Sequence, residues 1–415
     1  MKRISSQLPS TDASYYMRLR EWNMNDMQNK MAAQSRIKDL RDDPLAAARS
    51  ARLQSEIFRV ERFEQNVQTV RNRLTTAEGQ IRSAVDVLQR VRELGVEGAN
   101  GILDRNQMGY IGEEVNALLG ELLTIGNAKD ESGNFLFSGA LSRTEPFRLT
   151  QGHVPGGSGD LVTSVDYLGN VGRSSAEISD GAEVGVNLPG NVVFWAEQQQ
   201  VYSTIDAREY RVQADSTIRI DGAEIRLSTG DTVSAIIAKI NEANAPVKAR
   251  LDPVASSLVI ETTLPHQLWA EDIGGGTVLQ DLGILAPGGS HPPLNIARSA
   301  RVFGGSLFDQ VIGLRDALLE GSAEKVGSAG LRGIEDAITS IAGVLAEVGA
   351  RDSRLETVAK RLAWEKPELV RFDSQERDLD LAEAITRLKM LEYTHEAALN
   401  TAARVLKPSL LDFLR

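Results

Sequence analysis

The side chains that could carry chemistry in this chain are few and scattered. The four histidines, His153, His266, His291 and His395, lie far apart in dissimilar contexts, without the spacing of a local metal site. The chain has no cysteine, which excludes disulfide bonds, thiolate zinc sites and cysteine nucleophiles. The glycines that precede Thr277 lack the Lys-Ser/Thr sequence and the strand-to-helix context of a phosphate-binding loop.

Paired carboxylates are also better explained without catalysis. Glu113 and Glu114 lie opposite an apolar helical stripe, where a solvated face is expected. Asp42 and Asp43 precede Pro44, so they can cap the backbone donors of a helix that starts at the proline. No Gly-x-Ser-x-Gly elbow stands out in the sequence. We therefore predict a protein that is not an enzyme and that has no catalytic residue, cofactor or metal site.

The composition narrows the range of partners. The 415 residues carry a formal net charge of −11, with Lys and Arg interspersed among Asp and Glu, so no basic stripe is available for nucleic acid. No apolar run approaches the roughly 18 residues that cross a bilayer, and we expect no membrane insertion. Because no apolar segment follows Lys2 and Arg3, we also expect no cleaved secretory signal.

Apolar residues at a seven-residue spacing dominate both ends of the chain. One column comprises Leu53, Val60, Val67, Leu74, Ile81 and Leu88, and a second comprises Phe63, Val70, Ala77, Ala84 and Val91. The C-terminal run has Ile334, Ile341, Val348, Leu355 and Leu362 beside Ile338, Leu345 and Ala359, with Asp352 interrupting its second column. A third stretch has Ile111, Val115, Leu118, Leu122 and Ile125. Each stripe keeps one apolar face toward a partner helix, so the three segments are predicted to bury one another.

The segment between the helical ends has β patterning. Residues 148–190 are Gly-rich and give weak strand signals, whereas residues 216–227 alternate in polarity on both sides of an Asp-Gly pair, a strong hairpin signal. A short helix and a second strand pair are predicted after it. The predicted fold class is therefore mainly α with an α+β insert. Long N- and C-terminal helices pack as a coiled-coil-like rod, with a β-rich middle domain at one tip.

Several separated motifs resemble those of the bacterial flagellin family. Asp42, Asp43 and Pro44 match its Asp-Asp-Pro motif ahead of a long helix. Arg351, Arg354 and Glu356 occupy segments similar to its Val-Gly-Ala-Arg and Arg-Leu-Glu sequences. The segments 380–385 and 408–411 resemble its C-terminal signature, and the unit at about 216–284 is similar to a repeat shared by flagellins and hook-associated proteins.

One turn resembles the hook–filament junction branch of this family, the hook-associated protein 3 group. Gly133, Phe135, Phe137 and Gly139 follow the second long helix in the order typical of that branch. The resemblance implies a structural junction adaptor that joins a hook-side junction layer to the flagellin filament. The segment 403–411 is more similar to flagellins, so a filament subunit is the alternative. A secreted enzyme that uses the insert and a cytoplasmic coiled-coil scaffold are two further hypotheses.

The resemblance also implies a domain plan. Residues 1–44 and 375–415 would be terminal assembly helices, disordered in the monomer, and residues 45–147 and 301–374 the helical rod. Residues 148–300 would form the outer insert. The implied partners are further copies of the chain in an axial ring or layer, a hook-side junction protein, flagellin, and an export chaperone on the C-terminal helix. The implied location is an external or periplasmic bacterial flagellum, reached through the flagellar type III export apparatus.

The predicted subunit interface lies in the terminal helices. It comprises Met17, Met24, Met27, Met31, Leu381, Ile385, Leu388, Leu406, Leu410, Leu411 and Phe413. The seven-residue spacing of three of these methionines, near Tyr15, Tyr16 and Trp22, leaves two interpretations open. Flexible methionines suit a surface that repacks on a partner, but an ordinary core stripe has the same spacing.

Overall fold

The computed structural model describes residues 8–288 and 291–405, and the protein is mainly helical with a β-containing middle region. Its contacts divide the chain into two compact units. One unit contains residues up to Glu64 together with those from Ala359 onward, and the other is Gln65–Val358. Across the described ranges, the structure contains no helix that is both long and apolar enough to span a membrane.

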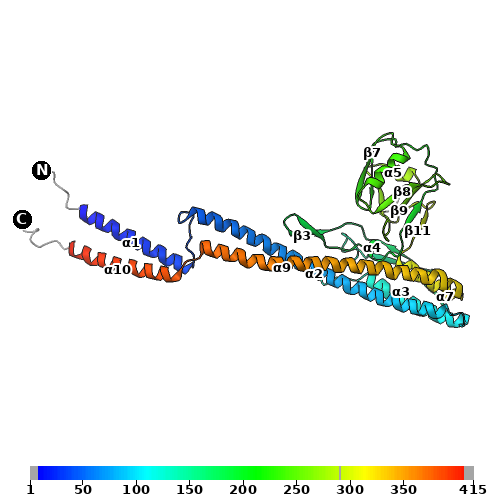
Figure 1. The fold of residues 1–415 in the computed structure, drawn as a ribbon, viewed down its shortest axis with the longest axis horizontal. Coiled ribbons are helices and arrows are strands. Elements are labelled where there is room, and N and C mark those ends of the chain that lie inside the picture. Colours follow the sequence, from blue (N-terminus) through cyan, green and yellow to red (C-terminus); the bar gives the residue numbers. More distant parts are fainter. Residues whose placement is uncertain (1–7, 289–290, 406–415) are drawn as a thin grey trace, which may run out of the picture. The chain divides into compact units, whose positions relative to one another are not determined.

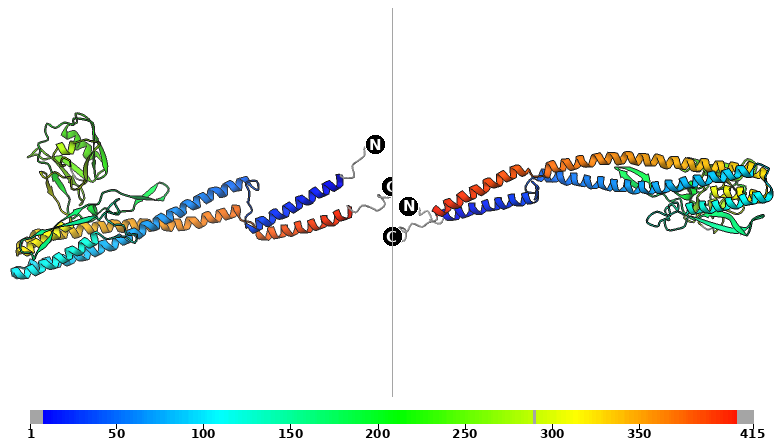
Figure 2. Two further views of the ribbon diagram at one scale, coloured as in Figure 1. Left: turned by 180° about the vertical axis from the view of Figure 1, so that it is seen from behind. Right: turned by 90° about the horizontal axis from the view of Figure 1, so that it is seen from below.

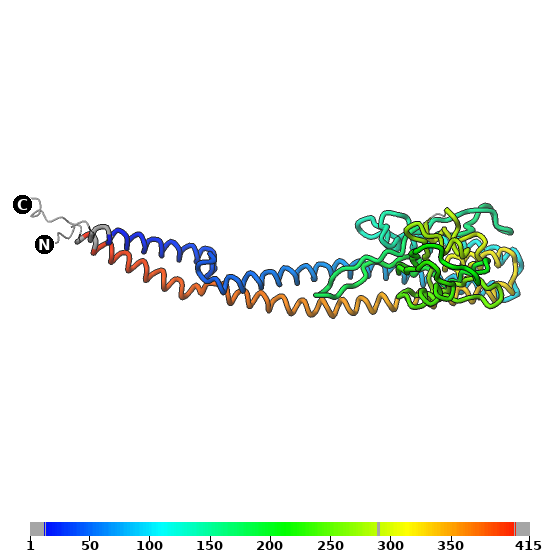
Figure 3. Tube along the Cα trace, turned by 90° about the horizontal axis from the view of Figure 1, so that it is seen from above, coloured from blue at the N-terminus to red at the C-terminus, as the bar shows by residue number. Residues whose placement is uncertain are grey.

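The first unit pairs the beginning of the chain with its end. Helix α1 (Leu8–Ala32) lies beside α10 (Leu381–Val405), as Figures 1 and 3 show from two directions. The first part of α2 (Pro44–Gly98) and the last part of α9 (Leu331–Arg377) also belong to this unit. Lys366 joins these two helices, since its Nζ lies 3.3 Å from a carboxylate oxygen of Glu61 and 3.1 Å from one of Glu64.

The second unit contains a helical part built from four helices. The remaining parts of α2 and α9 lie side by side in both views of Figure 2, and α3 (Arg105–Gly126) packs against α7 (Leu307–Glu320). A short helix α8 (Ala323–Lys325) and a π-helical turn η1 (Val326–Gly330) lead from α7 into α9. A capping box of Asp104 and Gln107 starts α3, and one of Ser306 and Asp309 starts α7.

The predicted heptad columns are largely confirmed as buried. The first two columns are buried from Val60 to Val91, while Leu53 is half-buried. In α9 the column from Ile334 to Leu362 is buried, whereas Ile338, Leu345 and Ala359 are half-buried.

In α3 the predicted stripe is only partly buried at Leu118. Leu118 is half-buried, and its neighbour Leu119 takes the core position with 1% exposure. Leu118 and Leu119 are adjacent on a helix that packs on α7 and also faces α2. The positions of α2 and α7 therefore decide which of the two leucines is buried.

Two hairpins and a short helix begin the β-containing region. Strands β1 (Phe147–His153) and β2 (Asp160–Tyr167) pair antiparallel, as do β3 (Ser175–Ser179) and β4 (Ala182–Gly185). The one-turn helix α4 (Gly190–Val193) follows.

The remaining insert is built from two antiparallel sheets and a helix. One sheet has the order β10 (Ala270–Ile273), β6 (Ser216–Ile220), β7 (Ala223–Leu227). The other has the order β11 (Arg301–Phe303), β5 (Gln200–Tyr202), β9 (Leu258–Thr262), β8 (Val247–Leu251). Helix α5 (Val233–Glu242) packs on β7 and β8, and the one-turn helix α6 (Val278–Asp281) lies near β10 and β6.

The predicted hairpin and short helix of the insert are confirmed. Strands β6 and β7 pair around Asp221 and Gly222, whose φ angles of 48° and 88° suit the tight turn that Asp-Gly favours. Thr232 caps α5 by accepting a hydrogen bond from the backbone N–H of Ala235. The apolar side of α5, with Ile236 and Ile240 fully buried, closes the core between the two sheets.

Candidate assembly interface

The turn that contains Asp42 and Asp43 starts α2 by satisfying several donors at once. Asp43 accepts a hydrogen bond of 3.0 Å from the backbone N–H of Ala46 and lies 3.1 Å from the guanidinium of Arg36. Those two groups, the Ala46 N–H first, lower the pKa of Asp43. Pro44 is the first residue of α2, so the Asp-Asp-Pro motif is a helix start, as the sequence predicted.

Asp42 stabilises the turn that precedes this helix. Its carboxylate accepts hydrogen bonds from the backbone N–H groups of Lys38 and Asp39, and Lys30 Nζ lies 2.9 Å away. The hydrogen bond from Lys30, the largest cause, and those from the two backbone N–H groups lower the pKa of Asp42 to about 2. The carboxylate is therefore ionised at neutral pH and holds α1 to the turn.

The chain just before this turn is bonded to the last residues of α9. The backbone N–H of Arg36 donates to the carbonyl of Arg377 at 2.8 Å, and its guanidinium donates to the carbonyl of Glu376 at 2.8 Å. Asp380 caps α10 by accepting hydrogen bonds from the N–H groups of Ala382 and Glu383. The segment before the Asp-Asp-Pro turn is thus hydrogen-bonded to the end of α9, and Asp380 starts α10 three residues further on.

The structure places the described members of the predicted subunit interface on the surface or near it. Met17, Met24, Met27, Met31 and Leu388 are half-buried, and Leu381 and Ile385 are each 45% exposed. Leu406, Leu410, Leu411 and Phe413 lie outside the described residues. Since no second chain is present, these residues stay a prediction of where subunits meet.

Several apolar side chains that the interface prediction omitted are more exposed than the four predicted methionines of α1. Trp22 is 64% exposed on α1, Met390 and Tyr393 are 69% and 75% exposed on α10, and Trp364 is 80% exposed on α9. Trp364 lies outside the predicted heptad columns. A large aromatic residue at such a position was the sequence signal that could have marked it as an interface candidate. Exposed apolar surface of this extent in one unit is typical of a region that another protein covers.

The turn after α3 is held by an aromatic cluster in the second unit. Phe137 is fully buried, and its ring centroid lies 4.9 Å from that of Phe194 in an edge-to-face arrangement. Its carbonyl accepts hydrogen bonds from the Tyr167 hydroxyl at 3.0 Å and the Gly190 N–H at 2.7 Å. The rings of Phe147 and Phe308 complete the cluster.

The two motif glycines of this turn have positive φ angles but different surroundings. Gly133 has a φ of 80° with open space where a Cβ would be, whereas Gly139 has a φ of 69° and a Cβ there would lie 2.0 Å from the carbonyl oxygen of Asn170. Phe135 stacks under the ammonium of Lys129, which lies 4.6 Å from the ring centroid. The motif therefore fixes how the chain leaves α3 and enters the insert.

The C-terminal motif residues lie on α9 around a buried column. Arg351 pairs with Glu347, and Arg351 and Arg354 line a groove of about 380 Å³ together with Arg173. Asp352, the residue that interrupts the second apolar column, is bonded bidentately by Arg71 of α2 at 2.9 and 3.3 Å. Glu356 adds to the negative charge that Arg71 faces. The charged residues of this segment therefore help to fix how α9 is aligned along α2.

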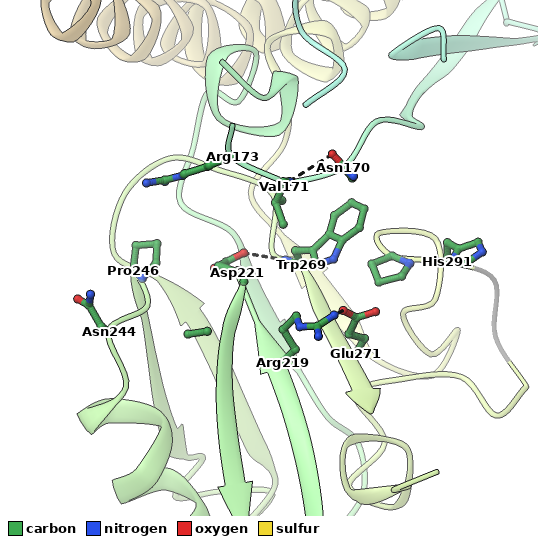
Figure 4. Close-up of a pocket in the computed structure, with 14 residues that line it drawn as sticks. Asn170, Val171, Arg173, Arg219, Asp221, Asn244, Pro246, Trp269, Glu271 and His291 are labelled. Carbon is green, nitrogen blue, oxygen red and sulfur yellow. Dashed lines mark hydrogen bonds and ion pairs between the residues drawn. The ribbon is translucent and has the colours of Figure 1, made fainter. Parts of the chain in front are cut away.

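A groove in the insert brings several polar groups together, which is a feature that an enzyme would need. Its volume is about 750 Å³. Figure 4 shows Arg219, Asp221, Trp269 and Glu271 along it. Arg219 lies 2.7 Å from both Glu224 and Glu271, and Asp221 accepts a hydrogen bond from the Trp269 N–H at 3.0 Å. These polar groups bond one another, which favours a structural role for them.

A buried histidine–aspartate pair supports the same turn. His266 Nε2 lies 2.9 Å from the second carboxylate oxygen of Asp221, and its Nδ1 lies 2.9 Å from the carbonyl oxygen of Leu264. Both side chains are less than a tenth exposed, so they are closed off from solvent. Within the part of the chain that the structure describes, no group of three or more potential metal ligands is present.

Comparisons with known families define the class of protein. The family model for the bacterial flagellin N-terminal helical region matches residues 4–142, and that for the C-terminal helical region matches residues 331–414. The flagellin hook IN motif matches residues 214–263. These matches define a class of structural, non-enzymatic proteins with helical ends. The chain belongs to the flagellin family and is a flagellar structural protein.

Individual relatives are similar over different lengths. The chain is 30% identical over 116 residues to flagellin FlaB1 of Treponema pallidum, a match that spans 41% of that relative's length. It is 20% identical to flagellin A of Vibrio anguillarum over 97% of this chain and 96% of that one.

Solved structures with similar chains include two flagellar proteins. A putative flagellar hook-associated protein from Vibrio parahaemolyticus is 16% identical, with a TM-score of 0.48, and the match covers 81% of this chain and all of that one. The flagellar junction protein FlgL from Legionella pneumophila is 19% identical, with a TM-score of 0.45, over 80% of this chain and all of that one.

Proposed function

We propose that this chain is the hook–filament junction adaptor, a subunit that joins the hook-side junction layer to the flagellin filament. The observation that carries the proposal is the turn after α3. Its sequence resembles the junction branch of the family, and Phe137 and Gly139 are locked in place by Phe194 and Asn170. The resemblance therefore falls on residues that decide the local fold.

Assembly would proceed through the terminal helices. Copies of the chain would pack side by side as a ring or layer, covering Trp22, Trp364 and Tyr393. Burying an aromatic side chain of this size contributes about 1.5–3 kcal/mol, so a few such contacts per subunit can stabilise a layer. The residues 1–44 and 375–415 would be disordered before assembly, with the cost of ordering them offset by this burial.

Hydrogen exchange on the purified monomer tests the assembly mechanism. Rapid exchange is expected through residues 8–32 and 381–405 in the free chain, with protection appearing on assembly. Strong protection of both segments in the monomer would contradict the coupling of folding to assembly.

Export would use the flagellar type III apparatus, with a chaperone bound to the C-terminal helix. Truncation of the chain at Val405 tests this role, since chaperone binding and export are expected to fall. Retention of both after the truncation would remove the chaperone site from the C-terminal helix.

A deletion strain tests the junction assignment. Loss of the chain is expected to leave hooks without attached filaments and to release flagellin monomers into the medium, because the filament would have nothing to assemble on. Normal motility would contradict any flagellar role and favour a cytoplasmic scaffold.

The second candidate is a filament subunit, which the full-length similarity to flagellin A of Vibrio anguillarum favours. Copy number separates the two functions. A junction adaptor is expected at a few copies per flagellum, whereas a filament subunit would be present in thousands.

A further inference from the structure

The solvent-facing side of the four-stranded sheet carries an unusual set of side chains for this acidic chain. Antiparallel pairing places two rows of residues across β11, β5, β9 and β8, and directly opposed residues share a face. One row is Arg301, Tyr202, Val259 and Arg250, and the adjacent row is Phe303, Gln200, Glu261 and Lys248. The intervening residues Val201, Ile260 and Ala249 point into the core on the other side of the sheet. We call the side formed by the two rows the cationic sheet face. Its strand-edge members Arg301, Phe303 and Lys248 are exposed, while Val259 at its centre is fully buried beneath its half-buried neighbours.

Ring contacts and hydrogen bonds order the centre of this face. The rings of Tyr202 and Phe303 meet edge-to-face with centroids 5.6 Å apart. Arg250 lies 5.5 Å from the Tyr202 ring centroid and donates to its hydroxyl at 2.9 Å, while the hydroxyl donates to the side-chain oxygen of Gln200 at 3.0 Å. An ion pair of 3.6 Å links Arg250 to Glu261. The aromatic rings are therefore held in fixed positions by the polar groups around them.

The margins of the face remain open to a partner. Arg301 and Lys248 are exposed, and Phe303 on the edge strand β11 is 56% exposed. The opposite edge is closed, because the side chain of Asn241 bonds both the N–H and the carbonyl of Ala249 on β8. An extended partner therefore has access over the face and along β11.

The charge of the face is opposite to that of the chain. Three cationic side chains, Arg301, Arg250 and Lys248, stand against one carboxylate, Glu261, whereas the whole chain carries −11. A local positive surface on an acidic protein attracts anions at that place and repels them elsewhere. Charge complementarity thus selects an anionic partner for this face.

We propose that the cationic sheet face binds an anionic polysaccharide, with sugar carboxylates on Arg301 and Lys248 and a sugar ring against Phe303. An extended sheet face suits a repeating polymer, and planar guanidinium groups match carboxylates in geometry. The exposed aromatic ring offers an apolar surface with a negative π-face to the C–H side of a sugar ring. Flagellin-family proteins are exported through the flagellar apparatus, away from the nucleic acid of the cytoplasm, which favours a glycan over a nucleic acid. The surface would serve a junction adaptor or a filament subunit equally.

Binding of polygalacturonate to the full-length chain tests the proposal, with dextran as the neutral polymer. The Kd for polygalacturonate is expected to rise about tenfold in an Arg301→Ala, Lys248→Ala double variant, and to rise with salt because the charges are exposed. Phe303→Ala is expected to weaken binding without changing the salt dependence. Arg226→Ala is the matched control, since Arg226 is an exposed cation on β7 of the other sheet, and its Kd should equal that of the parent chain.

Four results would overturn the proposal. The parent chain could fail to bind polygalacturonate, or bind dextran equally well. Arg226→Ala could weaken binding as much as the double variant, which would make the attraction non-specific. A single-stranded oligonucleotide of matched charge could bind more tightly than polygalacturonate, which would assign the face to nucleic acid. As a control, each variant should melt at the same temperature as the parent chain, which would show that the insert remains folded.

Discussion

Substituting alanine at the two motif glycines should have unequal effects on stability. Both Gly133 and Gly139 have positive φ angles, so alanine at either costs about 1–2 kcal/mol from backbone strain. At Gly139 the new Cβ would also lie 2.0 Å from the carbonyl oxygen of Asn170 and 2.4 Å from its side-chain oxygen. Displacing such neighbours costs a further 1–3 kcal/mol or so. Gly139→Ala should therefore cost about 2–5 kcal/mol and Gly133→Ala about 1–2 kcal/mol.

Urea unfolding of the two variants beside the parent chain measures this difference. Tryptophan fluorescence reports on the insert through Trp195 and Trp269, whose side chains are 6% and 9% exposed and whose emission should redden on unfolding, and far-ultraviolet circular dichroism reports on the helices. Coincident transitions would allow one free energy of unfolding to be assigned to each variant. Equal destabilisation by the two substitutions would refute the reasoning, since it would mean that Asn170 does not constrain the turn. A larger effect at Gly133 would refute it more strongly.

Three further predictions follow from the packing and charges. Phe308→Ala should lower the free energy of unfolding by about 3–5 kcal/mol, measured by urea titration, because the ring is fully buried in the aromatic cluster. Asp42→Asn should lower the melting temperature of the assembled protein, in which residues 1–44 are ordered, at pH 7 but not near pH 2. The stabilisation from this carboxylate is present above its ordinary pKa of 3.8 and is lost as the pH falls through about 2. Trp364→Ala should change monomer stability by less than about 0.5 kcal/mol yet reduce assembly measured by sedimentation, whereas Arg361→Ala on the same helix should leave both unchanged.

The helical ends could be predicted from sequence because their information is local and repeated. Val67, Leu74, Ile81 and Leu88 recur at one spacing over many turns, so an error at one position leaves the pattern readable. The hairpin around Asp221 was readable for the same reason, since alternation and the Asp-Gly pair agree.

The aromatic cluster could not be predicted, because it depends on contacts between distant segments. Phe137 and Phe308 belong to one cluster although 171 positions separate them in the sequence, and no local pattern links them. Arg315 shows the same limit. A charged residue on a surface helix is expected to be exposed, but Arg315 is fully buried and bonds Asn116 and Asp316. Only the packing of α3 against α7 determines that position.

The candidate interface stays a prediction, and its residues come from two kinds of observation. The methionines near Trp22 were proposed from their spacing, while Trp364 and Tyr393 follow no apolar column and are proposed from their exposure. The helical period describes the side chains that pack inside one copy of the chain. Side chains that contact a second copy need not follow that period. Their exposure in the folded chain is the better guide.

Immunogold electron microscopy of an epitope-tagged chain on intact flagella tests the central claim most directly. The tag belongs in the exposed turn that contains Val254, which is 88% exposed in the insert. A junction adaptor predicts gold at a single band where the hook meets the filament. Gold along the whole filament would contradict the junction assignment and support a filament subunit, and an unlabelled flagellum would contradict both.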